Sequence, residues 1–418
     1  MHNEVNASII TIGDELLIGQ TIDTNSAWIA KALNDIGIWV HRRVAVGDVW
    51  EDIWNALDEE SKNCKLVLIT GGLGPTADDI TKPLLCDYFG GKLIIDEIAL
   101  ANVRNIFENF LKRPLLDRNI KQAELPDVCV PIQNLKGTAP GMWFEKDGCI
   151  FISMPGVPHE MKNMMTEQVL PTLKNKLTLV PIYHKTLLTA GIGESFLAER
   201  ISVFETALPN YIKLAYLPNY GMVRLRLTAK YAGEQTKKEI EDKFQQLKQQ
   251  IEDVLVVDED ITLQEVLANL LKTKNKTIGT AESCTGGYLA HLLTAIPGSS
   301  AFFKGSIISY SNEIKSSLLN VETSTIEKFG AVSYETASEM VKGALSQLKT
   351  DYVIVTTGIM GPSGGTPDKP VGGVWIGVGS KNKVDIKFFH FRFDRQRNME
   401  LTAVNALNEM RKLILQEH

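Results

Sequence analysis

The amino-acid sequence predicts an α/β protein in which two three-layer α/β domains are joined by a small α+β domain. Apolar, β-rich runs alternate with helical patterns near both ends of the chain, and most of these runs end in glycine or acidic residues. Between them, two alternating strand patterns precede one long charged helix. We therefore expect domains at residues 1–170, 171–255 and 256–418.

Length and composition exclude several classes of protein. A chain of 418 residues is too long for one ordinary core. The formal net charge of −6 argues against broad nucleic-acid binding, and no apolar run approaches the ~20 residues that a membrane helix needs. The five cysteines are scattered without a CxxC pair, and no basic segment precedes an apolar core at the N-terminus. We therefore expect a cytoplasmic protein with reduced thiols and no signal peptide.

Acidic residues follow three strand runs of the first domain. The predicted elements are strands at residues 7–12, 40–46 and 65–70 and helices at residues 23–33 and 50–57. Asp14 and Glu15 follow the first strand, Asp48 follows the second, and a helix beginning at Asp78 and Asp79 follows the third. Because ligands bind at the carboxyl ends of parallel strands, we expect these carboxylates to share one crevice.

Residues 71–76 form a glycine-rich turn after the third strand. Residues 72–77 fit the GxGxxA pattern of dinucleotide-binding folds, but the pattern lies after the third strand and lacks the usual acidic strand end behind it. Alternatively, glycines let the backbone approach a phosphate, and the carboxylates hold a divalent metal ion bridged to it. If acidic residues served only to stabilise a helix N-terminus, that would explain the pair Asp78 and Asp79. It would not explain why acidic residues follow all three strands. We favour the phosphate and metal site, with Gly71, Gly72 and Gly74 as substrate contacts.

A hairpin is predicted next, because an Asp-Gly pair separates the apolar runs at residues 142–144 and 150–152. Gly137 and Gly156 bracket this hairpin, and we expect both to face the same crevice as substrate contacts, although ordinary turns also use glycine. A helix over residues 161–170 closes the domain, and the proline directly after it predicts an end or a kink.

A second strand–turn–helix pattern, in the last domain, carries a serine. An apolar strand run leads into the turn at residues 281–287, and an apolar helical run leads out of it. Ser283 is either a helix N-cap or a nucleophile beside backbone N–H groups. For the nucleophile, we expect the N–H groups of residues 284–287 to stabilise an oxyanion. The turn residues expected to contact substrate are Thr285, Gly286 and Gly287.

A serine hydroxyl is a poor nucleophile until a base takes its proton, and none of the seven histidines lies in a motif here. Tyr310 and Lys315 follow a strand run at residues 302–309. Because a nearby cation makes a phenol easier to deprotonate, we expect Lys315 to prime Tyr310. Tyr310 would then take the proton of Ser283.

Another glycine-rich loop, at residues 361–365, follows an apolar strand run and suits a substrate phosphate. Its expected substrate contacts are Gly361, Gly364 and Gly365. At the start of the closing helix, Arg395 or Arg397 could supply charge-assisted hydrogen bonds to the same phosphate.

Other chemistries use similar residues. Short-chain dehydrogenases have their tyrosine and lysine four residues apart, whereas Tyr310 and Lys315 are five apart and no dinucleotide turn precedes them. Penicillin-recognising enzymes need the pattern SxxK, which does not begin at Ser283. Cys284 is a third candidate nucleophile, but without a partnered base it fits a buried small residue better. If no such chemistry operates, Tyr310 and Lys315 are a strand-end aromatic and a solvated helix charge.

Long motifs in the first domain resemble a known family. Residues 71–81, 137–141 and 155–158 resemble the molybdopterin-binding domain family. Together with the turn that carries Ser283, nearly the whole chain resembles the CinA-type competence/damage-inducible proteins. Two unrelated sets of motifs occur in the expected order, so the chain is identified as a member of that family.

The resemblance implies two hydrolytic activities. The first domain is expected to be a metal-dependent ADP-ribose pyrophosphatase in which Asp48 and Asp79 match the acidic pair of the molybdopterin-binding fold. The last domain is expected to deamidate nicotinamide mononucleotide without a cofactor, with Ser283, Tyr310 and Lys315 matching the motif residues of the family. Further candidates are Asp14, Glu15 and Asp78 as metal ligands and Asn25 as a substrate contact.

The chain departs from the family pattern at one point. The family usually has Gly-Asp-Arg before the last helix, whereas Phe393 precedes Asp394 and Arg395 here. The sequence therefore does not decide whether Arg395 contacts the substrate phosphate. A second hypothesis is a molybdopterin-type ligand-binding protein with an inactive hydrolase-like C-terminal domain.

For the middle domain, the resemblance implies a KH-like fold. Residues 191–193 read Gly-Ile-Gly and lack the full GXXG clamp, and the segment is not notably basic. We therefore expect no RNA binding. For the middle domain, a spacer or a dimerisation element fits better than an RNA-binding module. We therefore expect a homodimer. We also expect no membrane binding.

Overall fold

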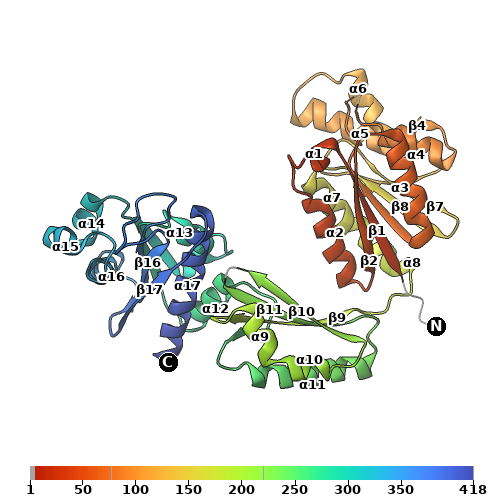
Figure 1. The fold of residues 1–418 in the computed structure, drawn as a ribbon. Coiled ribbons are helices and arrows are strands. Elements are labelled where there is room, and N and C mark those ends of the chain that lie inside the picture. Colours follow the sequence, from red (N-terminus) through yellow and green to blue (C-terminus); the bar gives the residue numbers. More distant parts are fainter. Residues whose placement is uncertain (1–4, 77, 220, 418) are drawn as a thin grey trace. The chain divides into compact units, whose positions relative to one another are not determined.

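The computed structural model describes residues 5–76, 78–219 and 221–417 (Figure 1). The fold is mixed α/β, as predicted. Contacts divide the chain into two compact units, formed by residues 1–184 with 228–240 and by residues 185–227 with 241–418. The segment predicted as the middle domain thus contributes to both units.

A six-stranded mixed sheet forms the centre of the first unit. Its strands, in sheet order, are β2 (Trp39–Val46), β1 (Asn6–Ile12), β3 (Leu66–Thr70), β8 (Cys149–Met154), β7 (Gly141–Lys146) and β6 (Val130–Ile132). The strands from β2 to β8 are parallel, whereas β7 pairs antiparallel with β8 and with β6. The predicted hairpin is confirmed, with Trp143 opposite Ile152.

Helices cover both faces of this sheet. The flanking helices are α2 (Thr24–Asp35) and α7 (Pro158–Met164) on one face and α3 (Trp50–Asn63) and α4 (Thr81–Phe89) on the other. Side chains alternate along a strand. Accordingly, Ala7 and Ile9 of β1 pack with the first pair of helices, and Ile10 and Ile12 pack with the second. The three-layer arrangement follows from apolar side chains on both faces of the parallel strands.

The helix that begins with α7 continues beyond its predicted end. A π-helical segment, η3 (Met165–Val169), joins it to α8 (Leu170–Lys176). Pro171 lies in the first turn of α8, where the missing N–H of proline is tolerated. The wider π turn precedes it, so the proline neither ends the helix nor breaks it.

The sequence patterns missed a group of short elements between α4 and β6. They are β4 (Leu93–Ile95), α5 (Glu97–Arg104), η1 (Asn105–Phe110), α6 (Asp117–Ile120), η2 (Lys121–Ala123) and β5 (Glu124–Pro126). Strands β4 and β5 pair antiparallel as a separate two-stranded sheet. Five of these six elements are runs of three to six residues, which are too short to show a helical or strand period, and α5 has only eight.

A four-stranded sheet, in the order β10-β11-β9-β12, follows. Its elements are β9 (Tyr183–Ala190), α9 (Glu194–Arg200), α10 (Ser202–Thr206), β10 (Ile212–Asn219), β11 (Met222–Ala229), α11 (Glu234–Gln250) and β12 (Leu255–Val257). The Gly-Ile-Gly segment joins β9 to α9. Strand β12 was not predicted; it pairs antiparallel with β9.

The C-terminal segment forms a second three-layer arrangement. Its strands, in sheet order, are β14 (Phe303–Ile308), β13 (Ile278–Glu282), β15 (Tyr352–Gly358), β16 (Gly373–Ser380) and β17 (Val384–His390). The helices are α12 (Leu263–Thr273), α13 (Tyr288–Thr294) and α17 (Arg395–Gln416) on one face and α14 (Asn312–Leu319), α15 (Thr323–Phe329) and α16 (Tyr334–Leu348) on the other, with a short η4 (Ser299–Ala301) before β14. Tyr352 and Ile354 of β15 pack toward the first group, and Val353 and Val355 toward the second.

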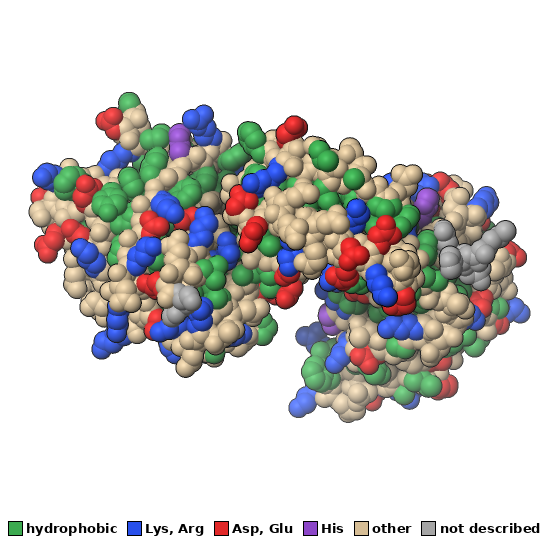
Figure 2. Space-filling model, turned by 90° about the horizontal axis from the view of Figure 1, so that it is seen from below, with side chains coloured by type: hydrophobic (Ala, Val, Ile, Leu, Met, Phe, Trp, Pro, Cys, Tyr) green, Lys and Arg blue, Asp and Glu red, His purple; other side chains and the backbone are tan. Residues whose placement is uncertain are grey.

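Figure 2 shows acidic and basic side chains interspersed over the face in view, with no broad region of one sign there. This distribution agrees with the small net charge of −6. On that face, nothing resembles the continuous basic surface that non-specific nucleic-acid binding needs.

Candidate active sites

Ser283 lies in the turn between β13 and α13, where the sequence predicts it. Its N–H donates a hydrogen bond to the carbonyl of Thr356 on β15 (2.9 Å), and the N–H of Ser309, just after β14, donates to the carbonyl of Glu282 (2.8 Å). Three neighbouring parallel strands therefore end at the serine. Ser283 is 8% exposed and lines a cavity of about 290 Å³.

The carboxylate of Glu282 holds this turn from inside. Glu282 is fully buried, and it accepts hydrogen bonds from the N–H groups of Gly287 (3.0 Å), Leu289 (3.1 Å) and Ala290 (2.9 Å). The hydroxyl of Thr285 donates to it as well (2.8 Å). An anion that satisfies several N–H groups at a helix start fixes where the helix begins. Sequence reasoning missed this role, although a charged residue at the end of an apolar strand is a signal for it.

The structure places Thr285, Gly286 and Gly287, predicted as substrate contacts, outside the wall of this cavity. The Thr285 hydroxyl is buried and bonded to Glu282 and to Thr356, and none of the three residues lines the cavity. The N–H of Gly286 donates to the carbonyl of Ser283. Within the described residues, the N–H groups of residues 284 and 285 donate to no backbone carbonyl. Of these two, only Cys284 lines the cavity, because Thr285 is fully buried. One of the four predicted oxyanion donors therefore lies at the cavity wall.

Lys315 contacts the serine directly. Its Nζ lies 3.1 Å from Ser283 Oγ, 2.7 Å from the carbonyl oxygen of Ser309 and 3.4 Å from that of Tyr310. Helix α14 begins just before it, with Ser311 as the N-cap. Lys315 is 1% exposed, and burial lowers the pKa of its ammonium below the ordinary 10.5. A lowered pKa increases the population of the neutral amine, which can accept a proton.

Lys315 was predicted to prime Tyr310, but the hydrogen bonds of the two side chains go to different partners. Lys315 meets the backbone carbonyl of Tyr310, whereas the phenol oxygen accepts a hydrogen bond from Arg395 Nη2 (3.2 Å). Tyr310 is 62% exposed and lines the same cavity as Ser283. Its side chain points from a strand end and that of Lys315 from a helix, so neighbours in sequence serve different parts of the cavity.

The far wall of the cavity matches the predicted phosphate region in part. Gly361, Gly364 and Arg395 line it, and Arg395 Nη1 donates to the carbonyl of Gly361 (2.8 Å). Gly365 does not line it, because this glycine lies against Val371. The guanidinium of Arg397, the alternative arginine, lies 4.8 Å from the ring centroid of Phe393 and is not part of the cavity wall.

Cys284 does not have the properties of a nucleophile. Burial raises the pKa of its thiol to about 12, so the thiol stays protonated at neutral pH. Cys284 is 6% exposed and packs in the hydrophobic core of its domain. Of the two adjacent candidates, Ser283 is therefore the nucleophile that the surroundings support.

In the first unit, a crevice of about 370 Å³ opens where β1, β2 and β3 end. Four of the predicted glycines line it: Gly71, Gly72, Gly74 and Gly156. The left-handed backbone of Gly71 (φ 118°) and Gly72 (φ 63°) suits glycine. Gly137 does not line the crevice; its carbonyl accepts a hydrogen bond from Asn102, and Thr138 and Ala139 line the wall instead. Ala77, the last residue of the GxGxxA pattern, lies outside the described residues.

Five carboxylates line this crevice: Glu15, Asp48, Asp78, Asp79 and Glu160. Asp79 accepts hydrogen bonds from the N–H groups of Gly74 and Thr76 (both 2.8 Å) and thereby shapes the glycine-rich turn. Sequence reasoning missed Glu160, which follows the motif at residues 155–158.

Asp14 is not part of the crevice wall. Its carboxylate accepts a hydrogen bond from the N–H of Asp48 (3.2 Å), and its own N–H donates to the Asp48 carboxylate (3.1 Å). This reciprocal pair joins the two strand ends. Asp14 therefore orients Asp48, which differs from the predicted role as a direct metal ligand.

The described residues of this crevice would supply only part of the ligand set of a divalent metal ion. Among the described residues, no group of three or more His, Cys, Asp and Glu side chains is placed to hold a metal ion. Burial, followed by the charges of Asp14, Glu15 and Asp78, raises the pKa of Asp48, so a nearby cation would be favourable there. Mg²⁺ commonly binds through one or two carboxylates plus substrate phosphates. Asp48 and Asp78 would hold it in that way, and the ion would supply Lewis-acid polarisation of a phosphate.

Comparison with known proteins covers all three segments of the chain. A family model described as CinA C-terminal domain matches residues 260–414. A model described as Probable molybdopterin binding domain matches residues 8–175, and one described as Damage-inducible protein CinA KH domain matches residues 184–257. The KH-like fold expected for the middle segment is confirmed by the last of these.

Full-length relatives resemble the chain over almost its whole length. A CinA-like protein of Flavobacterium psychrophilum is 45% identical over 416 residues, which cover 99% of this chain and 100% of that protein. A CinA-like protein of Cytophaga hutchinsonii is 42% identical over 414 residues, with 99% of each chain covered. A crystal structure described as the protein CinA with unknown function from Thermoplasma acidophilum shares 37% identity, covers 40% of this chain and 98% of that chain, and has a TM-score of 0.37. Among the described residues, no helix is both long and apolar enough to cross a bilayer.

Proposed function

Because the chain belongs to the CinA family and contains its molybdopterin-binding-like, KH and C-terminal domains, we propose that it is a bifunctional hydrolase of pyridine-nucleotide salvage. The C-terminal domain converts nicotinamide mononucleotide to nicotinate mononucleotide and ammonia. The N-terminal domain cleaves ADP-ribose at its pyrophosphate. The observation that carries the proposal is the contact of 3.1 Å between Lys315 Nζ and Ser283 Oγ.

The deamidation begins with proton transfer from the serine to the lysine. Neutral Lys315 takes the proton of the Ser283 hydroxyl as Oγ attacks the carboxamide carbon of the nicotinamide ring. The lysine then gives that proton to the departing nitrogen, the carbon–nitrogen bond breaks and ammonia leaves. A water molecule, deprotonated by the same amine, hydrolyses the acyl-enzyme and restores Ser283.

Several groups around the cavity are suited to this reaction. The N–H group of Cys284, which lines the cavity beside Ser283, is suited to the oxyanion of the tetrahedral intermediate. Arg395 and the glycine loop, at the other side of the cavity, suit the phosphate of the nucleotide. The hydrogen bond from Arg395 to the phenol of Tyr310 gives the tyrosine a positioning role instead of the predicted role of base.

For the N-terminal domain, the proposal rests on the glycine turn and the carboxylates that share one crevice. Backbone N–H groups at such a turn bind phosphate oxygens, and a divalent ion would neutralise the diphosphate. Asp79 keeps the turn in place through its hydrogen bonds to Gly74 and Thr76. Asp48, with its raised pKa, is the carboxylate best placed to bind the ion or to accept a proton from water.

Assays of the full-length protein on both substrates test the proposal. Ammonia release from nicotinamide mononucleotide should disappear in Ser283→Ala, while cleavage of ADP-ribose continues. Asp48→Asn should give the reverse pattern, so each variant is the control for the other. If neither substrate reacts with the wild type under any divalent metal, the second hypothesis of a ligand-binding protein with an inactive hydrolase-like domain gains support.

A further inference from the structure

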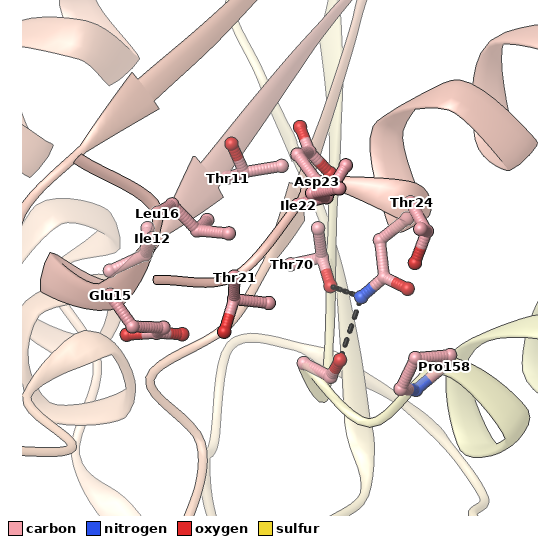
Figure 3. A pocket seen from close by; sticks show the side chains of 12 residues that line it. Thr11, Ile12, Glu15, Leu16, Thr21, Ile22, Asp23, Thr24, Thr70 and Pro158 are labelled. Carbon is pink, nitrogen blue, oxygen red and sulfur yellow. Dashed lines mark hydrogen bonds between the residues drawn. The ribbon is translucent and has the colours of Figure 1, made fainter. Parts of the chain in front are cut away.

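Asparagine side chains join loops at the strand ends in both units. In the first unit, Asn25, which was predicted as a substrate contact, lines a small pocket of about 120 Å³ (Figure 3). Its amide nitrogen donates to Thr70 Oγ1 (3.2 Å) and to the carbonyl of Gly156 (2.7 Å), shown as dashed lines in Figure 3. Asn25 thus joins the start of α2 to the loop after β8. In the C-terminal segment, Asn398 makes a similar connection between two loops.

Asn398 is fully buried, and its side-chain amide makes three hydrogen bonds. The amide nitrogen donates to the carbonyls of Met360 (3.1 Å) and Phe393 (2.9 Å). The amide oxygen accepts from the N–H of Phe393 (3.2 Å). Both donor hydrogens are therefore used, and both backbone polar groups of Phe393 have a partner. Because buried hydrogen bonds are costly to break, Asn398 holds the loop after β15 against the segment before α17.

Arg395 lies on the same face of α17 as Asn398, because residues three apart in a helix are neighbours. Its Nη1 donates to the carbonyl of Gly361 (2.8 Å), which follows in sequence the carbonyl that Asn398 binds. Two successive carbonyls of the loop are therefore held by two side chains of one helix face. Met360, Gly361 and Arg395 line the cavity that contains the serine, whereas Asn398 is not part of its wall.

The segment before Arg395 depends on the same asparagine. Residues 392–394 lie outside the regular elements and are exposed. The carboxylate of Asp394 caps α17 by accepting from the N–H of Arg397 (2.9 Å), and Asn398 binds the backbone of Phe393. Phe393 is also the residue at which the chain departs from the Gly-Asp-Arg pattern. Asn398 therefore fixes the point from which the side chain of Arg395 reaches the cavity.

We propose that Asn398 is a positioning residue, which orients Arg395 against the glycine loop so that the guanidinium binds the phosphate of a mononucleotide. The inference rests on the proposed deamidase site and extends it to a residue that makes no contact with the substrate. Ser283 and Lys315 belong to other elements, so loss of Asn398 should leave their contact intact. The loss should weaken the binding of phosphorylated ligands only.

Calorimetric titration of the full-length protein carrying Ser283→Ala, which prevents turnover, tests this role with nicotinamide mononucleotide and nicotinamide riboside. This parent protein should bind the mononucleotide more tightly than the riboside. The further substitution Asn398→Ala should lower the affinity for the mononucleotide about fivefold, the value of one hydrogen bond, and leave the affinity for the riboside unchanged. In the chain that keeps Ser283, Asn398→Ala should raise KM for the mononucleotide and leave kcat nearly unchanged.

The matched control is Asn408→Ala, which should change neither affinity. Asn408 is another buried asparagine of α17; its Oδ1 accepts from Arg411 Nε (3.1 Å), and it does not line the cavity. If Asn398→Ala does not fold, Asn398→Ser, whose hydroxyl can replace one of the lost hydrogen bonds, is measured in its place. Because Asn398 acts through Arg395, Asn398→Ala should cause little further loss in a protein that already carries Arg395→Ala.

Three results would overturn the role of Asn398: unchanged affinity for the mononucleotide, an equal loss for both ligands, or a full further loss in the protein with Arg395→Ala. Because binding is measured without turnover, the inference and the proposed function fail separately. If the wild type releases no ammonia but the expected difference in binding is found, only the proposed reaction is removed. Deamidation by the wild type, together with unchanged binding in Asn398→Ala, removes only the role of Asn398.

Discussion

The two candidate sites of this molecule are built in opposite ways. In the C-terminal cavity, the reacting groups are already in contact: Lys315 is 1% exposed and its Nζ meets Ser283 Oγ at 3.1 Å. In the N-terminal crevice, Asp14, Glu15 and Asp78 are exposed, and no three of the described carboxylates are gathered as metal ligands. The reacting groups of the first site thus touch one another, whereas the carboxylates of the second site line a crevice without being gathered as metal ligands.

The difference is one of solvation. Burial removes water from the lysine, lowers its pKa and leaves the serine hydroxyl as a near partner, which is the preorganisation that favours proton transfer. Exposed carboxylates keep their hydration and repel one another, so only a cation makes their approach favourable. The C-terminal reaction should therefore depend on individual side chains, and the N-terminal reaction on the solution conditions.

The largest expected effect is that of Ser283→Ala. Without the nucleophile, kcat for deamidation of nicotinamide mononucleotide should fall on the order of 10⁴-fold. Measured ammonia release is the readout, and ADP-ribose cleavage by the same preparation is the control. Retention of deamidation by this variant would show that another group attacks the carboxamide.

Lys315→Met should have the next largest effect. Methionine fills the same buried volume without an amine, so kcat should fall about 10³-fold, as expected for loss of a general base. A cooperative melting transition only a few degrees below that of the wild type would show that the fold is kept, because the variant loses the hydrogen bonds of the ammonium to the carbonyls of Ser309 and Tyr310. Substantial activity in a well-folded Lys315→Met variant would contradict the role of the lysine.

Removal of divalent ions should separate the two sites. A chelator should reduce ADP-ribose cleavage on the order of 10²-fold and leave deamidation unchanged, because the ion's charge is needed only at the diphosphate. Readdition of Mg²⁺ should restore the cleavage. Turnover of ADP-ribose that continues in the chelator would mean that the carboxylates act without a metal ion.

Arg395→Lys should have a smaller effect, confined to substrate binding. Lysine keeps the charge but cannot donate to the carbonyl of Gly361 and to a phosphate in the forked geometry of arginine. KM for nicotinamide mononucleotide should rise about tenfold with kcat nearly unchanged. Nicotinamide riboside, which lacks the phosphate, should show no such rise in KM. An equal rise for both substrates would contradict the proposed contact between Arg395 and the phosphate.

Much of the fold could be predicted from the sequence because the buried strands are apolar on both faces and end in glycine or polar residues. The strand runs at residues 7–12 and 65–70 differ from β1 and β3 by one residue at one end. The short elements between α4 and β6 were not predicted, because most of them have only three to six residues and show no period. The continuation of the helix through Pro171 was missed because a π turn before a proline has no sequence signature.

The sequence predicted which residues form the C-terminal site better than it predicted which of them touch one another. Ser283, Tyr310, Lys315 and Arg395 do meet around one cavity. Which of them touch depends on side-chain direction: Lys315 points inward from α14 to Ser283, 32 residues away in sequence, while the phenol of Tyr310 points to Arg395. The glycines after the serine looked available to a ligand, but a buried glutamate already binds one of them.

The measurement that tests the central claim most directly is the pH dependence of kcat/KM for deamidation, in the wild type and in Tyr310→Phe. A base must be deprotonated to act, so the rate should fall as the pH drops through the pKa of Lys315. Because burial lowers that pKa, this fall should lie below pH 10.5. We expect both proteins to show the same fall at the same pH, since the phenol is not the base. Loss of activity, or of this pH dependence, in Tyr310→Phe would contradict the account and return the role of base to the tyrosine.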